Sequence, residues 1–163
     1  KEDALRWYLN SRDKNCTVTN IKTSDLLNRD QKLTLDYDVS IANHVSSFDN
    51  EIYVDLNYNK EFNSFDFKER KTDFMLSYKS FDDITISLQI PDGYKVTKMP
   101  ENISIITDDY TISMKYEVKG NTLEYTKQFQ FKNGIIKSSK FNDWKNHYAT
   151  IQKNYSEQVV LTK

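Results

Sequence analysis

Three residues of the chain have the types that a cysteine hydrolase or transferase requires. Cys16, His44 and Asp55 follow one another in the order nucleophile, base and orienting carboxylate. A nucleophilic cysteine needs a depressed pKa, which commonly comes from a helix N-terminus or a neighbouring cation. Cys16 instead leads into Thr17-Val18-Thr19, which is typical of a β-strand, and no glycine-rich turn beside it could shape an oxyanion site. We therefore interpret Cys16 as an ordinary half-buried thiol and predict no catalytic residue, with a hydrolase as the alternative that Cys16→Ala would test.

The residues that could hold a metal ion are few. His44 and His147 are the two histidines, and neither has another ligand type at metal-binding spacing, so we predict no transition-metal centre and no cofactor. The pairs Asp82-Asp83 and Asp108-Asp109 could bind calcium if their loops converged. We expect each pair instead to top a turn between strands, because aspartate accepts local backbone hydrogen bonds there. The sequence leaves calcium binding by these loops open.

Aromatic residues raise the question of sugar binding. They make up 13% of the chain, chiefly 11 Tyr and 9 Phe, and carbohydrate-binding β-sandwiches expose flat rings. Trp144 lies on the apolar stripe of a predicted helix and Trp7 on a predicted opening helix, which favours burial of both. Most tyrosines lie at strand positions, where a ring can be buried while its hydroxyl stays wet. Glycan binding therefore remains an alternative function.

Composition bounds the class of protein. The 163 residues fit one domain with a real core, or at most two very small domains, and a single Cys excludes an internal disulfide. The net charge of −1 gives no indication of a nucleic-acid-binding face, and the absence of a long apolar run predicts no membrane span. The chain begins with Lys1 and shows no signal-peptide pattern, so we interpret it as a segment of a longer protein. Residues 1–13 are predicted to form a linker helix.

Alternation of apolar and polar residues predicts about seven to nine short antiparallel strands across residues 14–163. The turn signals between them are Pro91-Asp92-Gly93, Gly120-Asn121 and Asn133-Gly134. Such rows need a second layer to be buried, so we predict an antiparallel β-sandwich forming a single accessory domain. The apolar residues of the expected strands are Val18 and Ile21; Leu33, Leu35, Tyr37, Val39 and Ile41; Ile52, Val54 and Leu56; Ile84, Ile86, Leu88 and Ile90; Val96; Ile103 and Ile105; Ile112, Met114, Tyr116 and Val118; Leu123, Tyr125, Phe129 and Phe131.

Two segments depart from this alternation. Residues 60–80 spread aromatic side chains among charges, which predicts an excursion that packs on the core and ends in an edge strand, with an aromatic binding loop as the alternative. Residues 139–155 have helical spacing and predict a long helix whose first turn Ser138 or Ser139 could cap. A final strand is predicted at 158–162, at a sheet edge. The predicted helical stripe consists of Phe141, Trp144, Tyr148, Ile151 and Tyr155.

Two motifs resemble a known family. Ile90-Pro91-Asp92-Gly93-Tyr94-Lys95-Val96, followed by Met99-Pro100, is similar to a proline-tyrosine signature in the C-terminal domain of unknown function of bacterial transglutaminase-like proteins. The ending Gln158-Val159-Val160-Leu161-Thr162-Lys163 after the helix resembles the close of that domain. Arg70 matches a recurrent arginine that precedes an extended segment there. The resemblance spans essentially the whole chain, although residues 57–71 are unusually charged and rich in Asn.

The resemblance implies a place in a larger protein. In these proteins a β-rich N-terminal domain and a papain-like transglutaminase core precede a β-sandwich. The catalytic Cys, His and Asp of the family belong to that core, so none is carried onto this chain. The implied location is the Gram-negative cell envelope, periplasmic or extracellular. We expect a non-catalytic accessory module that braces the neighbouring core or contacts another envelope protein or a glycan.

Overall fold

The computed structural model describes residue 7 and residues 16–25, 27–42, 45–57, 60, 65–67, 69–77 and 79–163. The chain divides into two compact units, Lys1–His44 and Val45–Lys163. The expected linker helix over 1–13 lies outside the described residues except for Trp7, which is helical. The predicted burial of Trp7 is wrong, because its side chain is 72% exposed. The predicted domain boundary after residue 13 stays a prediction.

The first unit contains one antiparallel pair of strands, as predicted. Strand β1 (Cys16–Thr23) pairs with β2 (Leu35–Ile41), and the register shifts between Thr19 and Lys22. Asn20, at this irregularity, has a positive φ of 52°. The turn that joins the strands is held by a bond from the Ser24 N–H to the Thr34 carbonyl.

The apolar row of β2 is not buried, contrary to the expectation that a second layer would cover it. Leu33, Leu35, Tyr37 and Val39 are 37–66% exposed. The period of two correctly marked a strand with an apolar face, but a two-stranded ribbon has no layer of its own to cover that face. Val18 of β1 is buried.

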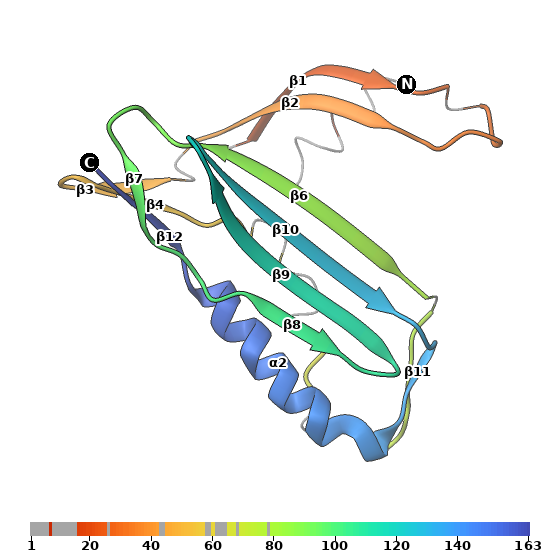
Figure 1. The fold of residues 1–163 in the computed structure, drawn as a ribbon. Coiled ribbons are helices and arrows are strands. Elements are labelled where there is room, and N and C mark those ends of the chain that lie inside the picture. The colour runs from red at the N-terminus through yellow and green to blue at the C-terminus, as the bar shows by residue number, and fades with distance from the viewer. Residues whose placement is uncertain are drawn as a thin grey trace. The chain divides into compact units, whose positions relative to one another are not determined.

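The second unit contains the main sheet and the helix (Figure 1). The main sheet is antiparallel throughout, in the order β6-β10-β9-β8. Long strands β9 and β10 form its centre, and their hairpin turns at Gly120-Asn121 as predicted. The bounds are β6 (Phe81–Gln89), β8 (Ile103–Ile106), β9 (Tyr110–Lys119) and β10 (Thr122–Phe131).

A smaller four-stranded sheet has the order β3-β4-β12-β7, and β11 pairs with β5. The last strand was predicted at an edge, and this is wrong: β12 (Val159–Thr162) lies between β4 and β7. Val159, Val160 and Leu161 are all buried, which is the pattern of a strand covered on both faces. The remaining bounds are β3 (Ser46–Phe48), β4 (Glu51–Val54), β5 (Phe74–Met75), β7 (Lys95–Lys98) and β11 (Ile135–Ile136).

The predicted helix is present as α2 (Phe141–Ser156), preceded by a 3₁₀ turn, η1 (Ser138–Lys140). The predicted serine cap is wrong: Lys140 is the N-cap residue and makes no side-chain capping bond. Ser138 instead donates its N–H and hydroxyl to Asp73, at 2.8 and 3.0 Å. Among the described residues, no helix combines the length and apolar character that a membrane crossing demands.

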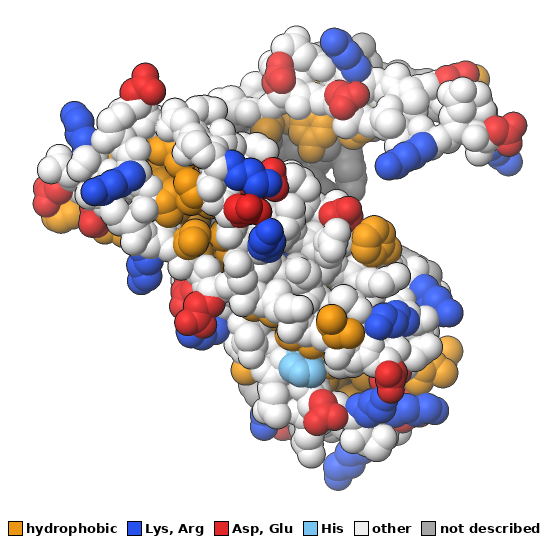
Figure 2. Space-filling view, viewed as in Figure 1, with side chains coloured by type: hydrophobic (Ala, Val, Ile, Leu, Met, Phe, Trp, Pro, Cys, Tyr) orange, Lys and Arg blue, Asp and Glu red, His pale blue; other side chains and the backbone are white. Residues whose placement is uncertain are grey.

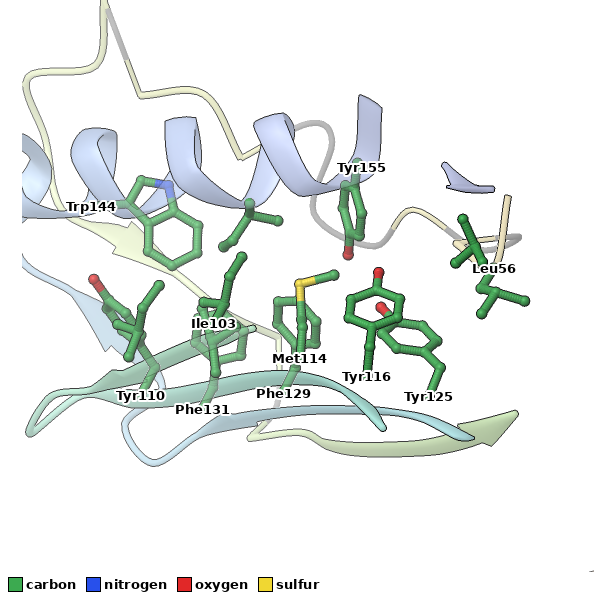
Figure 3. Packing of buried hydrophobic residues seen from close by; sticks show 14 of the residues in the cluster. Leu56, Ile103, Tyr110, Met114, Tyr116, Tyr125, Phe129, Phe131, Trp144 and Tyr155 are labelled. Atoms are coloured by element: carbon green, nitrogen blue, oxygen red, sulfur yellow. The ribbon is translucent and has the colours of Figure 1, made fainter. Parts of the chain in front are cut away.

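One hydrophobic core joins the main sheet, the smaller sheet and α2. Figure 3 shows aromatic and aliphatic side chains of β9 and β10 pointing toward the helix that lies across them. The predicted stripe faces this core: Phe141, Trp144, Ile151 and Tyr155 are buried, and Tyr148 packs against it. The mainly β fold with antiparallel sheets and a C-terminal helix is confirmed. Of the strands in the described residues, nine have four or more residues and three are shorter.

The segment after β4 packs on the core where the structure describes it. Phe67 is buried, and Phe65, Phe74 and Leu76 pack against the cluster. Phe65 and Phe74 meet edge to face, with ring centroids 5.1 Å apart. The predicted edge strand is limited to β5, and its third expected residue, Tyr78, lies outside the described residues. Core packing, rather than an aromatic binding loop, accounts for the described rings.

The turn at Pro91-Asp92-Gly93 depends on its glycine. The Tyr94 N–H donates to the Pro91 carbonyl at 3.0 Å, and Gly93 has a φ of +81°, as the third residue of a type II turn requires. A Cβ at Gly93 or Gly134 would meet no heavy atom within 4 Å, but only Gly93 has a positive φ. Alanine substitutions at the two glycines therefore distinguish the cost of backbone strain from the cost of steric contact.

We expect Gly93→Ala to lower the free energy of unfolding by about 1–2 kcal/mol, because an L-residue is strained in the left-handed region. Gly134→Ala is the control and should change stability by less than about 0.5 kcal/mol or increase it slightly. Urea unfolding followed by tryptophan fluorescence measures both. Equal effects of the two substitutions would contradict the assignment of the cost to φ.

Candidate functional site

A cleft of about 200 Å³ lies between the edge strand β8 and the C-terminal half of α2. Its strand wall is formed by Ile103, Ser104 and Ile105, and the helix wall is polar. Figure 1 shows α2 running alongside β8, and the two elements are in contact. The other lining residues are Glu101, Asn102, Thr150, Lys153, Asn154 and Glu157.

Asn154 ties the two walls together at the base of the cleft. Its Nδ2 donates to the Glu101 carbonyl at 2.8 Å, and its Oδ1 accepts the Tyr116 hydroxyl at 3.0 Å. Asn102 adds a second tie, since its Oδ1 accepts the Tyr116 backbone N–H at 2.7 Å. Helix, central strand and the approach to β8 are thus fixed to one another through neutral polar groups.

The network continues into the core. Asn57 donates from Nδ2 to the Tyr116 hydroxyl at 3.3 Å and accepts the Tyr125 hydroxyl at 2.5 Å. The rings of Tyr116 and Tyr125 stack, with centroids 4.4 Å apart and planes at 18°. Burial raises the pKa of Tyr116, and hydrogen bonding to Asn57 and Tyr125 opposes part of that rise. Figure 3 shows both hydroxyls in the layer between sheet and helix.

These polar groups are matched inside the protein. Among the described residues, every buried side-chain nitrogen or oxygen atom has a hydrogen-bond partner. Asn57 and Asn154 are only 2–3% exposed, so their amides act on neighbouring side chains and backbone. The network therefore fixes the shape of the cleft and leaves its charged rim to face solvent.

The rim of the cleft carries two carboxylates and one ammonium. Lys153 lies 3.6 Å from Glu101, and both side chains are largely exposed, so this ion pair adds little stability. Glu157 is partly exposed and makes no ion pair with any described residue. Positive and negative side chains are intermixed over the face of the molecule seen in Figure 2. The rim of the cleft is therefore charged and exposed to solvent.

Residues 50–161 match the model of a protein family described as "Domain of Unknown Function with solved-structure structure (DUF3858)". The match covers more than half of the chain. The chain belongs to the DUF3858 family. The matched range contains the whole main sheet, α2 and the cleft, whereas the β1–β2 pair lies outside it. The matched region is thus shorter than the whole-chain resemblance expected from the sequence.

The chain is also similar in fold to a crystal structure of a "putative protease" from Parabacteroides distasonis ATCC 8503. The TM-score is 0.54 at 14% sequence identity, and the similarity covers 71% of this chain. The chain covers only 24% of the P. distasonis chain. No curated protein matches the sequence. The likeness shows a shared fold.

A second cleft of the DUF3858 domain, of about 220 Å³, lies at the β8–β9 turn. Asp108 and Asp109 form this turn, as predicted for that pair. Asp109 accepts bonds from Lys140 Nζ at 2.9 Å and Asn133 Nδ2 at 2.7 Å. These bonds hold the pKa of Asp109 below its usual value. The other lining residues are Thr107, Tyr110, Lys140 and Asp143.

The Asp pairs do not form a calcium site among the described residues, where no group of three or more His, Cys, Asp or Glu could hold a metal ion. Asp82 and Asp83 lie inside β6, so the expectation that they top a turn is wrong. Successive strand residues point to opposite faces, which separates their carboxylates. At the other pair, the cation beside Asp109 is Lys140.

The Asp109–Lys140 bond predicts a specific pH dependence. Because the pKa of Asp109 is lowered in the folded state, its contribution is complete above the unfolded pKa of about 4 and is lost as the pH falls further. We expect Asp109→Asn to lower the free energy of unfolding by up to about 1 kcal/mol at pH 6. Unfolding curves from pH 6 to pH 2.5 should show this difference shrinking below pH 4. A difference independent of pH would contradict the ionic origin.

Of the three residues considered for cysteine chemistry, the structure describes the backbone of Cys16 and the whole of Asp55. Cys16 begins β1, the strand context that the sequence indicated, while its side chain and His44 lie outside the described residues. Asp55 forms an ion pair with Lys60 at 3.1 Å and accepts the Asn57 backbone N–H at 2.8 Å. Its carboxylate therefore stabilises the segment after β4.

The second histidine and the second tryptophan both serve packing. His147 Nδ1 is 2.8 Å from the Tyr110 hydroxyl, and burial, with Asp143 and Asp109 nearby, raises the pKa of Tyr110 to about 12. Trp144 is buried as predicted. Its ring is therefore not available as a sugar platform.

Arg70, the residue that resembled a family arginine, holds a loop. Its guanidinium donates to the carbonyls of Thr72 and Asp73 at 2.9 and 3.1 Å. It also lies over the Phe74 ring, 5.1 Å from the centroid. The side chain therefore fixes the extended segment that leads into β5.

Sequence reasoning missed the polar network beneath the first cleft. Asn57 follows an alternating strand and Asn154 borders the apolar stripe of the helix, positions at which a polar residue usually faces water. Their partners, Tyr116 and Tyr125, are predicted to lie in the apolar rows of strands. The spacing of the residues does not indicate that these tyrosines and the two asparagines, from four separate segments, bond to one another. The sequence did contain one signal: both tyrosines lie in the inward-facing rows of two adjacent strands, where side chains directly opposite each other pair.

Proposed function

We propose that this DUF3858 domain is a non-catalytic accessory module that braces a neighbouring catalytic core or contacts a protein partner. The observation that carries the proposal is the partial coverage: the fold corresponds to 24% of the longer P. distasonis chain. That protein is described as a "putative protease". A recurring fold that makes up a minor part of such a chain fits a module attached to a separate active domain.

The chemistry of the described residues supports the same function. The buried polar side chains have hydrogen-bond partners within the protein, Asp109 is bonded to Lys140 at a turn, and His147 is bonded to Tyr110. The charged rim beside β8 offers a polar surface to a partner. This arrangement resembles a contact site more than a reaction site, in which polar groups converge on an open space.

The proposed neighbour follows from the resemblance to transglutaminase-like proteins. The proline-tyrosine signature forms the turn before β7, and the closing residues form β12, next to β7 in the smaller sheet. Both motifs thus maintain one sheet. We place the module after a papain-like transglutaminase core in the Gram-negative cell envelope, periplasmic or extracellular.

The experiment combines the module with the transglutaminase-like core of its parent protein, expressed separately. Isothermal titration calorimetry should show association, and the thermal midpoint of the core should rise on mixing. The isolated module should show neither protease nor transglutaminase activity. Absence of both binding and a thermal shift would count against the bracing function, and turnover by the isolated module would overturn the non-catalytic assignment.

One observation favours glycan binding as a second candidate. Trp7 is 72% exposed, as a ring that stacks on a sugar must be. A glycan array tests it with Trp7→Ala as the comparison. Hits that disappear in this variant would support a glycan-binding module, and an array without hits would remove the candidate.

A further inference from the structure

Strand β8 is an edge of the main sheet and has an open row of backbone groups. The Thr107 N–H donates to the Tyr110 carbonyl at 2.9 Å, which makes these two residues a hydrogen-bonded pair. In an antiparallel ladder hydrogen-bonded and non-hydrogen-bonded pairs alternate. The observed register, with Ile105 opposite Ile112 and Ser104 opposite Ser113, therefore directs the backbone groups of Ile103 and Ile105 to β9.

The same alternation turns the N–H and C=O groups of Ser104 and Ile106 away from β9, toward the open edge. No hydrogen bond from the backbone of either residue to another described residue is present. Ile106 is 76% exposed, and Ser104 is also exposed. A strand edge of this kind is a template for another extended chain.

The edge is accompanied by a ready-made groove. The cleft of about 200 Å³ has β8 as one wall and Thr150, Lys153 and Glu157 of the α2 end as the other. Asn154 fixes the spacing of these walls through Glu101 and Tyr116. Protein domains that bind peptides by strand addition obtain affinity from the main-chain bonds and specificity from side-chain pockets.

We propose that β8 binds an extended peptide segment of a protein partner, with a basic side chain of that segment directed to Glu157 at the rim of the cleft. The peptide adds to the main sheet as a fifth strand and bonds to the backbone of Ser104 and Ile106. This inference rests on the proposed function as a contact module and names the kind of partner that it contacts.

The charge of the rim selects a basic peptide. Two carboxylates, Glu101 and Glu157, and one ammonium group, Lys153, line the cleft, and Lys153 already lies 3.6 Å from Glu101. Glu157 is thus the carboxylate left to pair with an incoming Lys or Arg. Opposite charge at a rim position contributes to the choice of partner and to the rate of association.

The decisive variant is Ser104→Pro. It removes an N–H that points away from the ladder, and proline is tolerated on an edge strand when its missing N–H faces outward. Ser104→Ala keeps the backbone donor. Ser87→Pro is the matched control on β6, the other edge strand of the sheet. The Ile90 N–H donates to the Asn121 carbonyl, so Ile90 and Leu88 are the residues whose backbone groups face β10. The Ser87 N–H therefore points outward, as the Ser104 N–H does.

The probe is a phage-displayed library of random peptides of about twelve residues, selected on the whole chain. We expect enrichment of peptides with Lys or Arg, and Ser104→Pro should weaken their binding at least about tenfold, as loss of main-chain bonds does. Ser104→Ala and Ser87→Pro should bind as the unaltered protein does. Glu157→Gln should weaken the basic peptides about threefold to tenfold.

Amide hydrogen exchange of the unaltered protein tests the same site without a variant. In the free protein the amides of Ile103 and Ile105 should exchange slowly and those of Ser104 and Ile106 rapidly, and an enriched peptide should slow the latter two. This measurement decides the matter if Ser104→Pro does not fold. No enriched peptide, unchanged exchange, or equal binding to Ser104→Pro would overturn the inference.

Sedimentation of the chain without peptide tests whether a second copy of the chain binds at the β8 edge instead. A dimer that Ser104→Pro converts to a monomer would mean that a second copy occupies the edge, which also overturns the inference. The experiments distinguish a failure of strand addition at β8 from a failure of the proposed contact function. Association with the transglutaminase-like core that persists in Ser104→Pro, together with no peptide enrichment, would remove strand addition and leave the contact module intact.

Discussion

Trp144→Ala is expected to lower the free energy of unfolding by about 3–5 kcal/mol, the range for removal of a buried Trp or Phe side chain. Trp144 is 1% exposed on the core face of α2. A domain of this size has a total stability of about 5–15 kcal/mol, so the loss would remove a large part of it. The thermal midpoint of the module should fall accordingly.

The reason is the central position of this ring. It packs edge to face on Tyr110, with centroids 5.0 Å apart, and contacts the rings of Phe65, Phe67 and Phe131 at 5.8–6.1 Å. Its Nε1–H donates to the Phe65 carbonyl at 2.6 Å. One side chain thereby links the helix, the main sheet and the segment after β4.

Guanidinium unfolding followed by circular dichroism at 222 nm measures the effect. Lys145→Ala, exposed on the next position of the same helix, is the control and should change stability by no more than about 0.5 kcal/mol. Trp144→Phe should fall between the two, since it keeps an aromatic ring but loses area and the N–H donor. A loss below about 1.5 kcal/mol for Trp144→Ala would mean that the helix does not depend on this contact.

The sequence predicted those elements whose signal is periodic and local. Period two located β9 and β10, because alternate residues from Tyr110 to Tyr116 and from Leu123 to Phe131 are buried on one face. Helical spacing located α2 to within two residues. The turn at Gly93 was predictable because only its residue type suits the backbone angle there.

The wrong predictions concern burial and position in a sheet, which depend on the strands or layers that pack against an element. The run Val159-Val160-Leu161 is buried on both faces, and three consecutive apolar residues are consistent with such a strand, so the prediction of an edge position for it is wrong. The apolar row of β2 signalled a strand with one covered face, while the two-stranded ribbon leaves it exposed. Periodicity identifies an element and a face, and long-range packing decides whether the face is covered.

The candidate site was beyond the sequence for a similar reason. The cleft exists because α2 runs beside an edge strand, and the bonding direction of Ser104 follows from one hydrogen bond in the adjoining turn. Neither is encoded in residue type. The paired aspartates, in contrast, were conspicuous in the sequence, yet they serve a strand and a turn.

The second large effect is expected at Asn154, which connects α2 to Tyr116 of β9 and to Glu101, just before β8. Asn154→Leu should lower the free energy of unfolding by about 2–4 kcal/mol. The substitution leaves the buried Tyr116 hydroxyl without its acceptor and the Glu101 carbonyl without its donor, and an unmatched buried polar group costs about 1–3 kcal/mol. Leucine preserves the volume, so the loss reports on hydrogen bonding.

A double-mutant cycle with Tyr116→Phe tests the network directly. Tyr116→Phe alone should cost about 1–2 kcal/mol, because it removes a hydroxyl that serves both Asn57 and Asn154. In the Tyr116→Phe background, Asn154→Leu leaves one polar group fewer without a partner. The losses of the two single variants should therefore sum to about 0.5–3 kcal/mol more than the loss of the double variant. Strict additivity would mean that the two side chains do not interact in solution.

The cycle also bears on the cleft, because Asn154 sets the distance between its walls. If the network only stabilises the fold, Asn154→Leu should leave amide exchange at Ser104 and Ile106 as fast as in the unaltered protein, and peptide binding should fall only with the folded fraction. If it also holds the groove open, binding per folded molecule should fall several-fold while the exchange of Ile103 and Ile105 stays slow. We expect the second result, since the bond from Asn154 to the Glu101 carbonyl joins the helix wall to the chain that leads into β8.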